Sequence, residues 1–174
     1  MIFEETGIAG LYNILIEKKE DDRGFFARIW DEELFREKGL NPKIAQCSIS
    51  SNNKKGTWRG LHIQYPPYAE AKIVRCTRGS LYDIVVDLRK DSPTFKKWFS
   101  TEISAENHKM LYVPEGCAHG YQTLEDNTDA AYQITEMFKP ENSGGVRWDD
   151  PAFGIKLPLD ISVISKKDSS WNFL

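Results

Sequence analysis

Residues 72–88, KIVRCTRGSLYDIVVDL, decide the fold class of this chain. From residue 81 onward the side chains alternate with a period of two, which is typical of an extended strand. One face of that strand is wholly apolar and consists of Tyr82, Ile84, Val86 and Leu88. Residues 72–77 form a second strand by the same criteria, and Arg78-Gly79-Ser80 predicts a tight hairpin between the two. The stretch therefore predicts antiparallel β-structure.

Short segments with strand character continue on both sides of this stretch. They are separated by Gly, Pro, Asn and Asp, and their residue ranges are 44–50, 59–64, 98–103, 109–113, 120–123 and 130–137. The best helix signal covers only residues 31–38, where Gly39 can end the helix. Many short strands with few helices predict an all-β sandwich or jelly roll. Residues 140–174 are irregular and are expected to wrap over the barrel, so we predict one domain over residues 1–174.

Composition excludes several classes of protein. The formal net charge of −3 argues against a nucleic-acid binder, although a locally basic pocket for a small anion remains compatible with it. No apolar run is long enough for a membrane helix, and residues 1–12 lack the pattern of a signal peptide. The three cysteines are far apart and form no C-x-x-C pair, which predicts neither a disulfide framework nor a zinc knuckle. We therefore expect a cytoplasmic protein that contacts neither nucleic acid nor membrane.

The three histidines are the first candidates for chemistry, although a single histidine is more often structural than catalytic. His108 lies in a polar turn and is interpreted as structural. His62 lies in the strand RGLHIQ at residues 59–64, where it shares strand parity with Gly60 and Gln64 and not with the apolar residues between them. That face predicts either a polar barrel interior or an exposed sheet surface.

For four further residues, a structural and a functional interpretation are both compatible with the sequence. Lys72 shares its strand face with apolar residues, so it is either a buried cation in a pocket or a side chain that reaches solvent at the strand end. Tyr132 has the pattern of a core tyrosine, and Asp168 that of a solvated residue. His119 follows a Pro/Gly turn as in metal-binding proteins, but His62-Ile63-Gln64 lacks the second histidine of an H-x-H ligand pair. The sequence therefore predicts no metal site.

Eight short stretches carry a resemblance to a known family. They are DRGFF at 22–26, RGLHIQ at 59–64, AKIVR at 71–75, VDLR at 86–89, SPTF at 92–95, SAEN at 104–107, VPEG at 113–116 followed by AHG at 118–120, and RWDDP at 147–151. In this order they are similar to the dTDP-4-dehydrorhamnose 3,5-epimerase family. A single stretch is weak support, whereas the ordered set along most of the chain is specific.

The resemblance implies a cupin jelly-roll barrel, or double-stranded β-helix, with a few short peripheral helices. It implies a homodimer that needs no cofactor. It also implies a nucleotide-diphosphate 4-keto-6-deoxy sugar as substrate, inverted at C3 and C5 as in the conversion of dTDP-4-dehydro-6-deoxyglucose to dTDP-4-dehydrorhamnose. A proton next to a ketone is weakly acidic, so such a reaction requires a base poised near neutral pH, which histidine provides.

The resemblance also implies a role for particular residues. His62 is the base, Asp168 orients it, Tyr132 is the general acid, and Lys72 holds the carbonyl oxygen of the substrate. The residues expected to bind the nucleotide, its diphosphate or the sugar are Arg23, Phe26, Gln46, Arg59, His119, Phe138 and Lys167.

Some positions depart from the family pattern. Cys47-Ser48 replaces a common Asp-Asn pair, Arg28 replaces a common glutamate, and Phe138 lies where many members carry an aromatic hydroxyl. These departures leave the reaction class unchanged and bear only on the dTDP base and the exact sugar. Three alternatives are weighed beside the 3,5-epimerase: an epimerase that inverts only C3 of another nucleotide 4-keto sugar, a metal-dependent cupin enzyme, and a non-catalytic cupin that binds sugar nucleotides.

Overall fold

The computed structural model describes residues 1–174 and contains two six-stranded sheets and a separate hairpin. The first sheet has the order β1 (Ile2–Glu5), β2 (Tyr12–Leu15), β10 (Met110–Val113), β7 (Lys72–Arg78), β12 (Thr128–Ile134) and β5 (Gln46–Asn52). The second has the order β13 (Ser143–Gly145), β6 (Thr57–Gln64), β11 (Cys117–Thr123), β8 (Ser80–Asp87) and β9 (Trp98–Ser104), with β14 (Val163–Ile164) parallel to β6. The remaining elements are the hairpin β3 (Lys19–Asp21) and β4 (Gly24–Phe26), the helices α1 (Glu32–Glu37) and α2 (Lys166–Ser169), and the 3₁₀ turn η1 (Pro140–Asn142).

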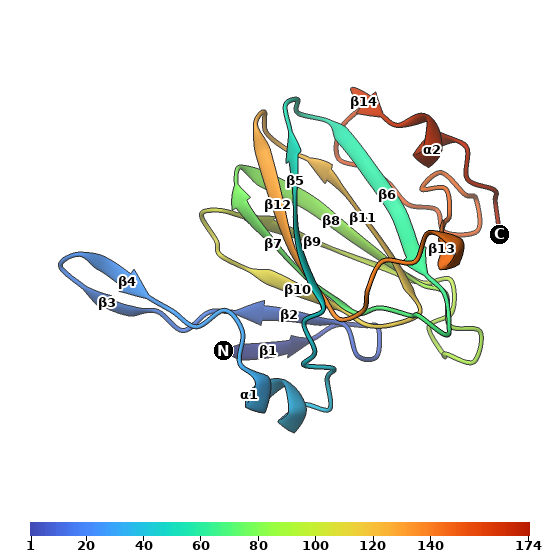
Figure 1. Ribbon diagram of the computed structural model, residues 1–174. Helices are drawn as coiled ribbons and strands as arrows, with labels where there is room; N and C mark the ends of the chain where they lie inside the picture. The colour runs from blue at the N-terminus through green and yellow to red at the C-terminus, as the bar shows by residue number, and fades with distance from the viewer.

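The two sheets lie face to face, as in a jelly roll, which confirms the predicted all-β class (Figure 1). A cluster of buried side chains from both sheets fills part of the space between them and includes Val74, Leu81, Val85, Leu111 and Tyr121. The helix predicted at residues 31–38 is also confirmed. Asp31 caps α1 by accepting hydrogen bonds from the backbone N–H groups of Glu33 and Leu34, and Lys38 ends it.

The predicted hairpin between residues 72–77 and 81–88 is wrong. The turn at Gly79 is tight, but β7 pairs with β10 and β12 while β8 pairs with β9 and β11, so the chain crosses there from one sheet to the other. The reason is that β8 is buried on both faces. Ile84 and Val86 pack outward, whereas Leu81 and Val85 pack between the sheets. A strand buried on both faces does not indicate from its sequence which neighbour it will pair with.

Residues 140–174 cover the outer face of the second sheet, as predicted. Val146, Phe153 and Ile155 form a buried cluster with apolar side chains of that sheet, including Ile84 and Val86. Figure 1 shows this segment beside β6, with α2 near the end of the traced chain. The wrapping segment therefore reaches the strand that carries His62 and brings Asp168 to it.

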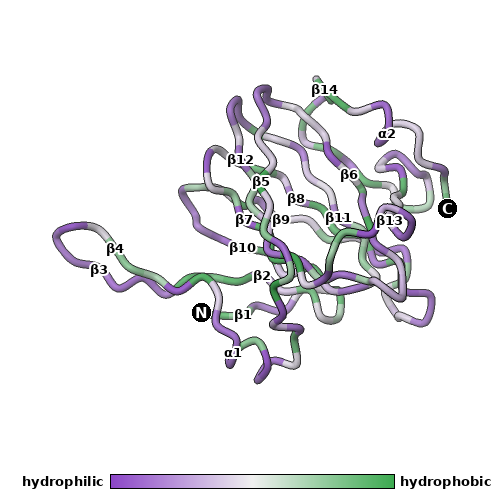
Figure 2. The backbone as a smooth tube through the Cα atoms, viewed as in Figure 1, coloured by the Kyte–Doolittle hydropathy of each residue, from purple (hydrophilic) through white to green (hydrophobic).

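The β3–β4 hairpin extends away from the barrel (Figure 1). The tip of the hairpin is hydrophilic, and the β4 side is more hydrophobic (Figure 2). Strand β4 carries two exposed phenylalanines, Phe25 and Phe26. An arm with exposed aromatic side chains is a feature that isolated monomers rarely keep. No helix of the chain is long and apolar enough to cross a membrane.

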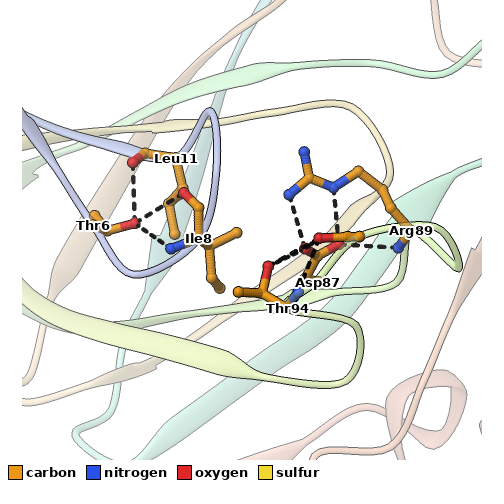
Figure 3. Close-up of polar contacts among 7 residues, drawn as sticks. Thr6, Ile8, Leu11, Asp87, Arg89 and Thr94 are labelled. Carbon is orange, nitrogen blue, oxygen red and sulfur yellow. Dashed lines mark hydrogen bonds and ion pairs between the residues drawn. The ribbon is translucent and has the colours of Figure 1, made fainter.

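A buried carboxylate holds the loop that follows β8 (Figure 3). Both oxygens of Asp87 accept hydrogen bonds from the Arg89 guanidinium, at 2.8 Å each, and Oδ2 also accepts from the hydroxyls of Ser92 and Thr94 at 2.6 Å. Burial alone would raise the pKa of the Asp87 carboxyl, but these hydrogen bonds outweigh burial and hold the pKa well below its ordinary range.

We expect Asp87→Asn to lower the free energy of unfolding by about 2–3 kcal/mol at neutral pH, because charge-assisted hydrogen bonds are lost. The folded-state pKa of Asp87 lies below that of the unfolded chain. The stabilisation is therefore complete above about pH 4 and is lost as the pH falls towards the folded-state pKa. Urea unfolding of both proteins at pH 7 and pH 3 measures this, with the exposed Asp91→Asn as control. If Asp87→Asn lowered the free energy of unfolding equally at both pH values, the loss would come from altered packing and not from the lost charge.

Candidate functional site

A cavity of about 360 Å³ opens between the two sheets. Eight of the eleven residues predicted to form the site line this cavity: Gln46, Arg59, His62, Lys72, His119, Tyr132, Phe138 and Lys167. They come from five strands of both sheets, from α2 and from the segment after β12. Residues that are far apart in sequence thus meet in one place.

His62 and Asp168 form a hydrogen-bonded pair beside this cavity. The distance between His62 Nε2 and Asp168 Oδ1 is 2.7 Å, and the side chains are 40% and 6% exposed, respectively. Burial alone would raise the pKa of Asp168, but hydrogen bonds from His62, from the backbone N–H of Gly60 and from Ser165 hold it below its ordinary value. Asp168 is therefore a carboxylate, and it fixes the hydrogen of His62 on Nε2. The other ring nitrogen, Nδ1, is left free to accept a proton.

Two glycines allow the strand carrying His62 to approach its neighbour. Gly60 has a φ of +124°, and a Cβ at this position would lie 2.6 Å from the Cα of Gly120 on β11. The pairing register shifts at this point, so that His62 faces His119 and Arg59 faces Tyr121. Gln64, which alternation along the strand places on the face of His62, is buried, and its side chain hydrogen-bonds the backbone of Tyr68, Met137 and Lys139.

Lys72 points into the cavity and does not reach solvent at the end of its strand. Its ammonium nitrogen lies 2.9 Å from a carboxylate oxygen of Glu70, and both side chains are largely buried. Glu70 also lines the cavity. Sequence reasoning missed Glu70, although its position two residues before a candidate cation was a usable signal.

A second histidine–carboxylate pair lies in the same cavity wall. His119 Nε2 is 2.9 and 3.0 Å from the two carboxylate oxygens of Asp83, and both residues are buried. Burial raises the pKa of the Asp83 carboxyl, although the neighbouring His119 and Lys72 act to lower it. Sequence reasoning noticed Asp83 only as the polar member of an alternating strand, because its partner lies 36 residues further along the chain.

Tyr132 lines the wall opposite His62, since it belongs to β12 of the first sheet while His62 belongs to β6 of the second. Burial raises the pKa of Tyr132 well above its ordinary value, and nearby Tyr121 and Asp83 raise it further. The side chain therefore remains a neutral phenol at neutral pH, which can donate a proton. Its ring centroid is 6.1 Å from that of His119.

Arg23 and Phe26 are the two predicted residues that lie away from this site. Both belong to the extended β3–β4 hairpin. The Arg23 side chain is 89% exposed and Phe26 is 70% exposed. Neither lines the cavity of its own chain. No three or more His, Cys, Asp or Glu side chains lie together as metal ligands.

The cavity thus combines an imidazole that has one free ring nitrogen, a phenol on the opposite wall and the ammonium group of a lysine. Comparisons with known proteins give it a context. Residues 5–174 match the family model described as dTDP-4-dehydrorhamnose 3,5-epimerase. The protein of that name from Sinorhizobium fredii is 43% identical over 98% of this chain and 88% of its own length.

Solved structures agree over the whole fold. The dTDP-4-dehydrorhamnose 3,5-epimerase of Bacillus anthracis, with TDP and PPi bound, has a TM-score of 0.95 and is 36% identical over 99% of both chains. The dTDP-6-deoxy-D-glucose-3,5-epimerase of Legionella pneumophila, in complex with dTDP-4-keto-L-rhamnose, has a TM-score of 0.92. It is 32% identical over 99% of this chain and 92% of its own.

Proposed function

The chain belongs to the dTDP-4-dehydrorhamnose 3,5-epimerase family, and on this premise we propose that it inverts C3 and C5 of dTDP-4-dehydro-6-deoxyglucose, giving dTDP-4-dehydrorhamnose. It is thus an isomerase whose substrate is a nucleotide-diphosphate sugar. One observation carries the proposal. A base-type histidine and a neutral phenol line opposite walls of one cavity. Inversion of a carbon requires that a proton leave from one face and return to the other.

His62 is the base in this proposal. With Nε2–H held by Asp168, Nδ1 accepts the proton from the carbon next to the C4 ketone. The Asp168 carboxylate then stabilises the imidazolium, which is the role of the aspartate in a catalytic triad. The short distance between the two residues and the burial of the carboxylate support this role.

Lys72 stabilises the charge that develops on the substrate. Removal of the proton places negative charge on the C4 oxygen, and a fixed ammonium group in a partly buried cavity lowers the energy of that enolate. The ion pair with Glu70 holds Lys72 in place before the substrate arrives. Tyr132 then delivers a proton to the opposite face of the carbon.

The remaining cavity residues bind the substrate. Arg59 and Lys167 supply the positive charge that a diphosphate requires, and the forked donors of an arginine match phosphate oxygens. We assign the nucleotide and sugar contacts to the other predicted residues that line the cavity, Gln46, His119 and Phe138.

A homodimer would give Arg23 and Phe26 a place in the site. The β3–β4 hairpin stands away from its own barrel, and Phe26 is exposed, so the arm is suited to reach the cavity of a second copy. Apolar Ile49, 67% exposed on β5, adds to the surface available for pairing. Sedimentation of the purified protein tests this, and a monomer at assay concentrations would contradict it. A cytoplasmic location stays a prediction.

The proposed reaction is tested by a time course in heavy water, followed carbon by carbon by NMR. We expect dTDP-4-dehydro-6-deoxyglucose to gain deuterium at both C3 and C5 as inverted product forms. Other nucleotide 4-keto sugars are tested in the same way. Deuterium at C3 alone, or faster reaction of one of these other sugars, would favour the C3 epimerase. Loss of activity on exhaustive chelation with rescue by one metal would favour a metal-dependent enzyme. If none of these nucleotide sugars exchanged hydrogen with the solvent, the result would favour a non-catalytic protein that binds sugar nucleotides.

A further inference from the structure

Trp171 follows α2 in the chain and packs against His62, the histidine that pairs with Asp168. Its ring centroid is 6.5 Å from that of His62, with an angle of 74° between the planes, which is an edge-to-face arrangement. The ammonium nitrogen of Lys167 lies 5.3 Å from the centre of the same indole. One side chain therefore contacts both the proposed base and a proposed diphosphate ligand.

The indole fits a space that only a glycine leaves open. Gly145 on β13 pairs with His62 on β6, and a Cβ at Gly145 would lie 2.4 Å from Cε2 of Trp171. The ring thus packs directly on the backbone of the strand next to His62. Such a close fit leaves the ring little freedom to move.

The residues after Trp171 are fixed as well. The backbone N–H of Leu174 donates a 2.7 Å hydrogen bond to Oδ2 of Asp150, which is buried. The guanidinium of Arg147 lies 4.9 Å from the ring centre of Phe173. Trp171 is therefore held from both sides, by α2 before it and by these contacts after it.

Helix α2 needs such support. It has four residues, and a helix of this length has almost no stability of its own. It nevertheless carries both Lys167 and Asp168, whose positions must be accurate for catalysis, because small displacements of catalytic groups are costly.

We propose that Trp171 is a positioning residue, which holds His62 against Asp168 and places Lys167 at the cavity by packing its ring between them and Gly145. The inference rests on the proposed function for its consequence in catalysis, but not for the geometry itself. The indole N–H is buried and has no hydrogen-bond partner, so the ring surface, and not the polar group, makes the contribution. Phenylalanine at position 171 should therefore preserve the positioning role, whereas alanine should abolish it.

The test compares Trp171→Ala, Trp171→Leu and Trp171→Phe with wild type, with Trp98→Phe in β9 as the matched control. The first readout is the far-downfield proton NMR signal of the His62 Nε2–H, recorded without substrate. Trp171→Ala and Trp171→Leu should lose this signal by faster exchange with water, while Trp171→Phe and Trp98→Phe keep it. Leucine fills part of the apolar volume but has no planar ring. The Trp171→Leu variant therefore tests the proposal even if the alanine variant fails to fold.

The second readout is turnover. Trp171→Ala and Trp171→Leu should lose roughly tenfold or more in kcat and raise KM, as expected for misplaced catalytic groups, whereas Trp171→Phe stays within about threefold. Wild-type kcat together with an intact NMR signal in Trp171→Leu would overturn the proposal, as would equal losses in the phenylalanine and alanine variants. If wild type itself converts no nucleotide 4-keto sugar, the proposed function fails, while the NMR comparison still decides the positioning role.

Discussion

His62→Asn should lose nearly all turnover, by about 10²–10⁴-fold, because the loss of a general base costs this much when no other group accepts the proton. Asparagine is close in size and retains a hydrogen-bond donor towards Asp168, so the packing around the carboxylate is disturbed little. It has no nitrogen that can accept a proton at neutral pH. Binding of dTDP should stay close to wild type, since His62 acts on the sugar and not on the diphosphate.

Single-turnover rates in heavy water and dTDP titrations measure the two effects separately. His108→Asn is the matched control, because His108 has a φ of +53°, which asparagine tolerates, and it does not line the cavity. A His62→Asn enzyme that remained within a few-fold of wild type would remove His62 from the role of base.

Tyr132→Phe should separate proton removal from inversion. The base and the partner of the enolate oxygen are intact in this variant, so His62 still removes the proton. Delivery from the opposite wall fails, because the phenol that burial keeps protonated is gone. His62 then returns a proton to the original face. The variant should exchange substrate hydrogen with solvent faster than it forms inverted product, with a loss of about 10²-fold or more in inversion.

Mass and NMR time courses in heavy water follow both processes. Tyr82→Phe is the matched control, since its hydroxyl bonds Ser100 on the outer side of the second sheet. Wild-type inversion of C3 and C5 by Tyr132→Phe would return the tyrosine to the role of a cavity wall.

Periodicity in the sequence located most of the strands, because β6, β8 and β12 carry regular side-chain patterns. It failed where pairing depends on the backbone alone. Strand β13 is Ser-Gly-Gly, which has no apolar pattern, yet it pairs with β6 in the structure. The Gly79 turn shows the same limit, since local signals specify a turn and not the sheet that the next strand joins.

The site was predictable where a residue lies in a conspicuous motif, as His62 does. Asp83 was missed because its partner His119 lies 36 residues further along the chain and only the fold brings the two together. Glu70 was missed although its partner Lys72 lies only two residues away in the sequence. Asp168 was identified only through family resemblance, since a single aspartate after two lysines is by itself typical of solvent-exposed chain. Arg23 and Phe26 were predicted to bind the substrate, but within one chain both are exposed on the β3–β4 hairpin and neither lines the cavity.

Strand β6 has a consequence for the order in which the molecule assembles. It pairs with β11, β13 and β14, all of which come much later in the chain, and His62 meets Asp168 across a separation of 106 residues. Contacts between distant segments form slowly, because a long loop must close before they contribute stability. During synthesis most strands of the barrel are therefore available before Asp168, the partner of His62, has emerged. A refolding chain should therefore regain its strands first and its turnover last.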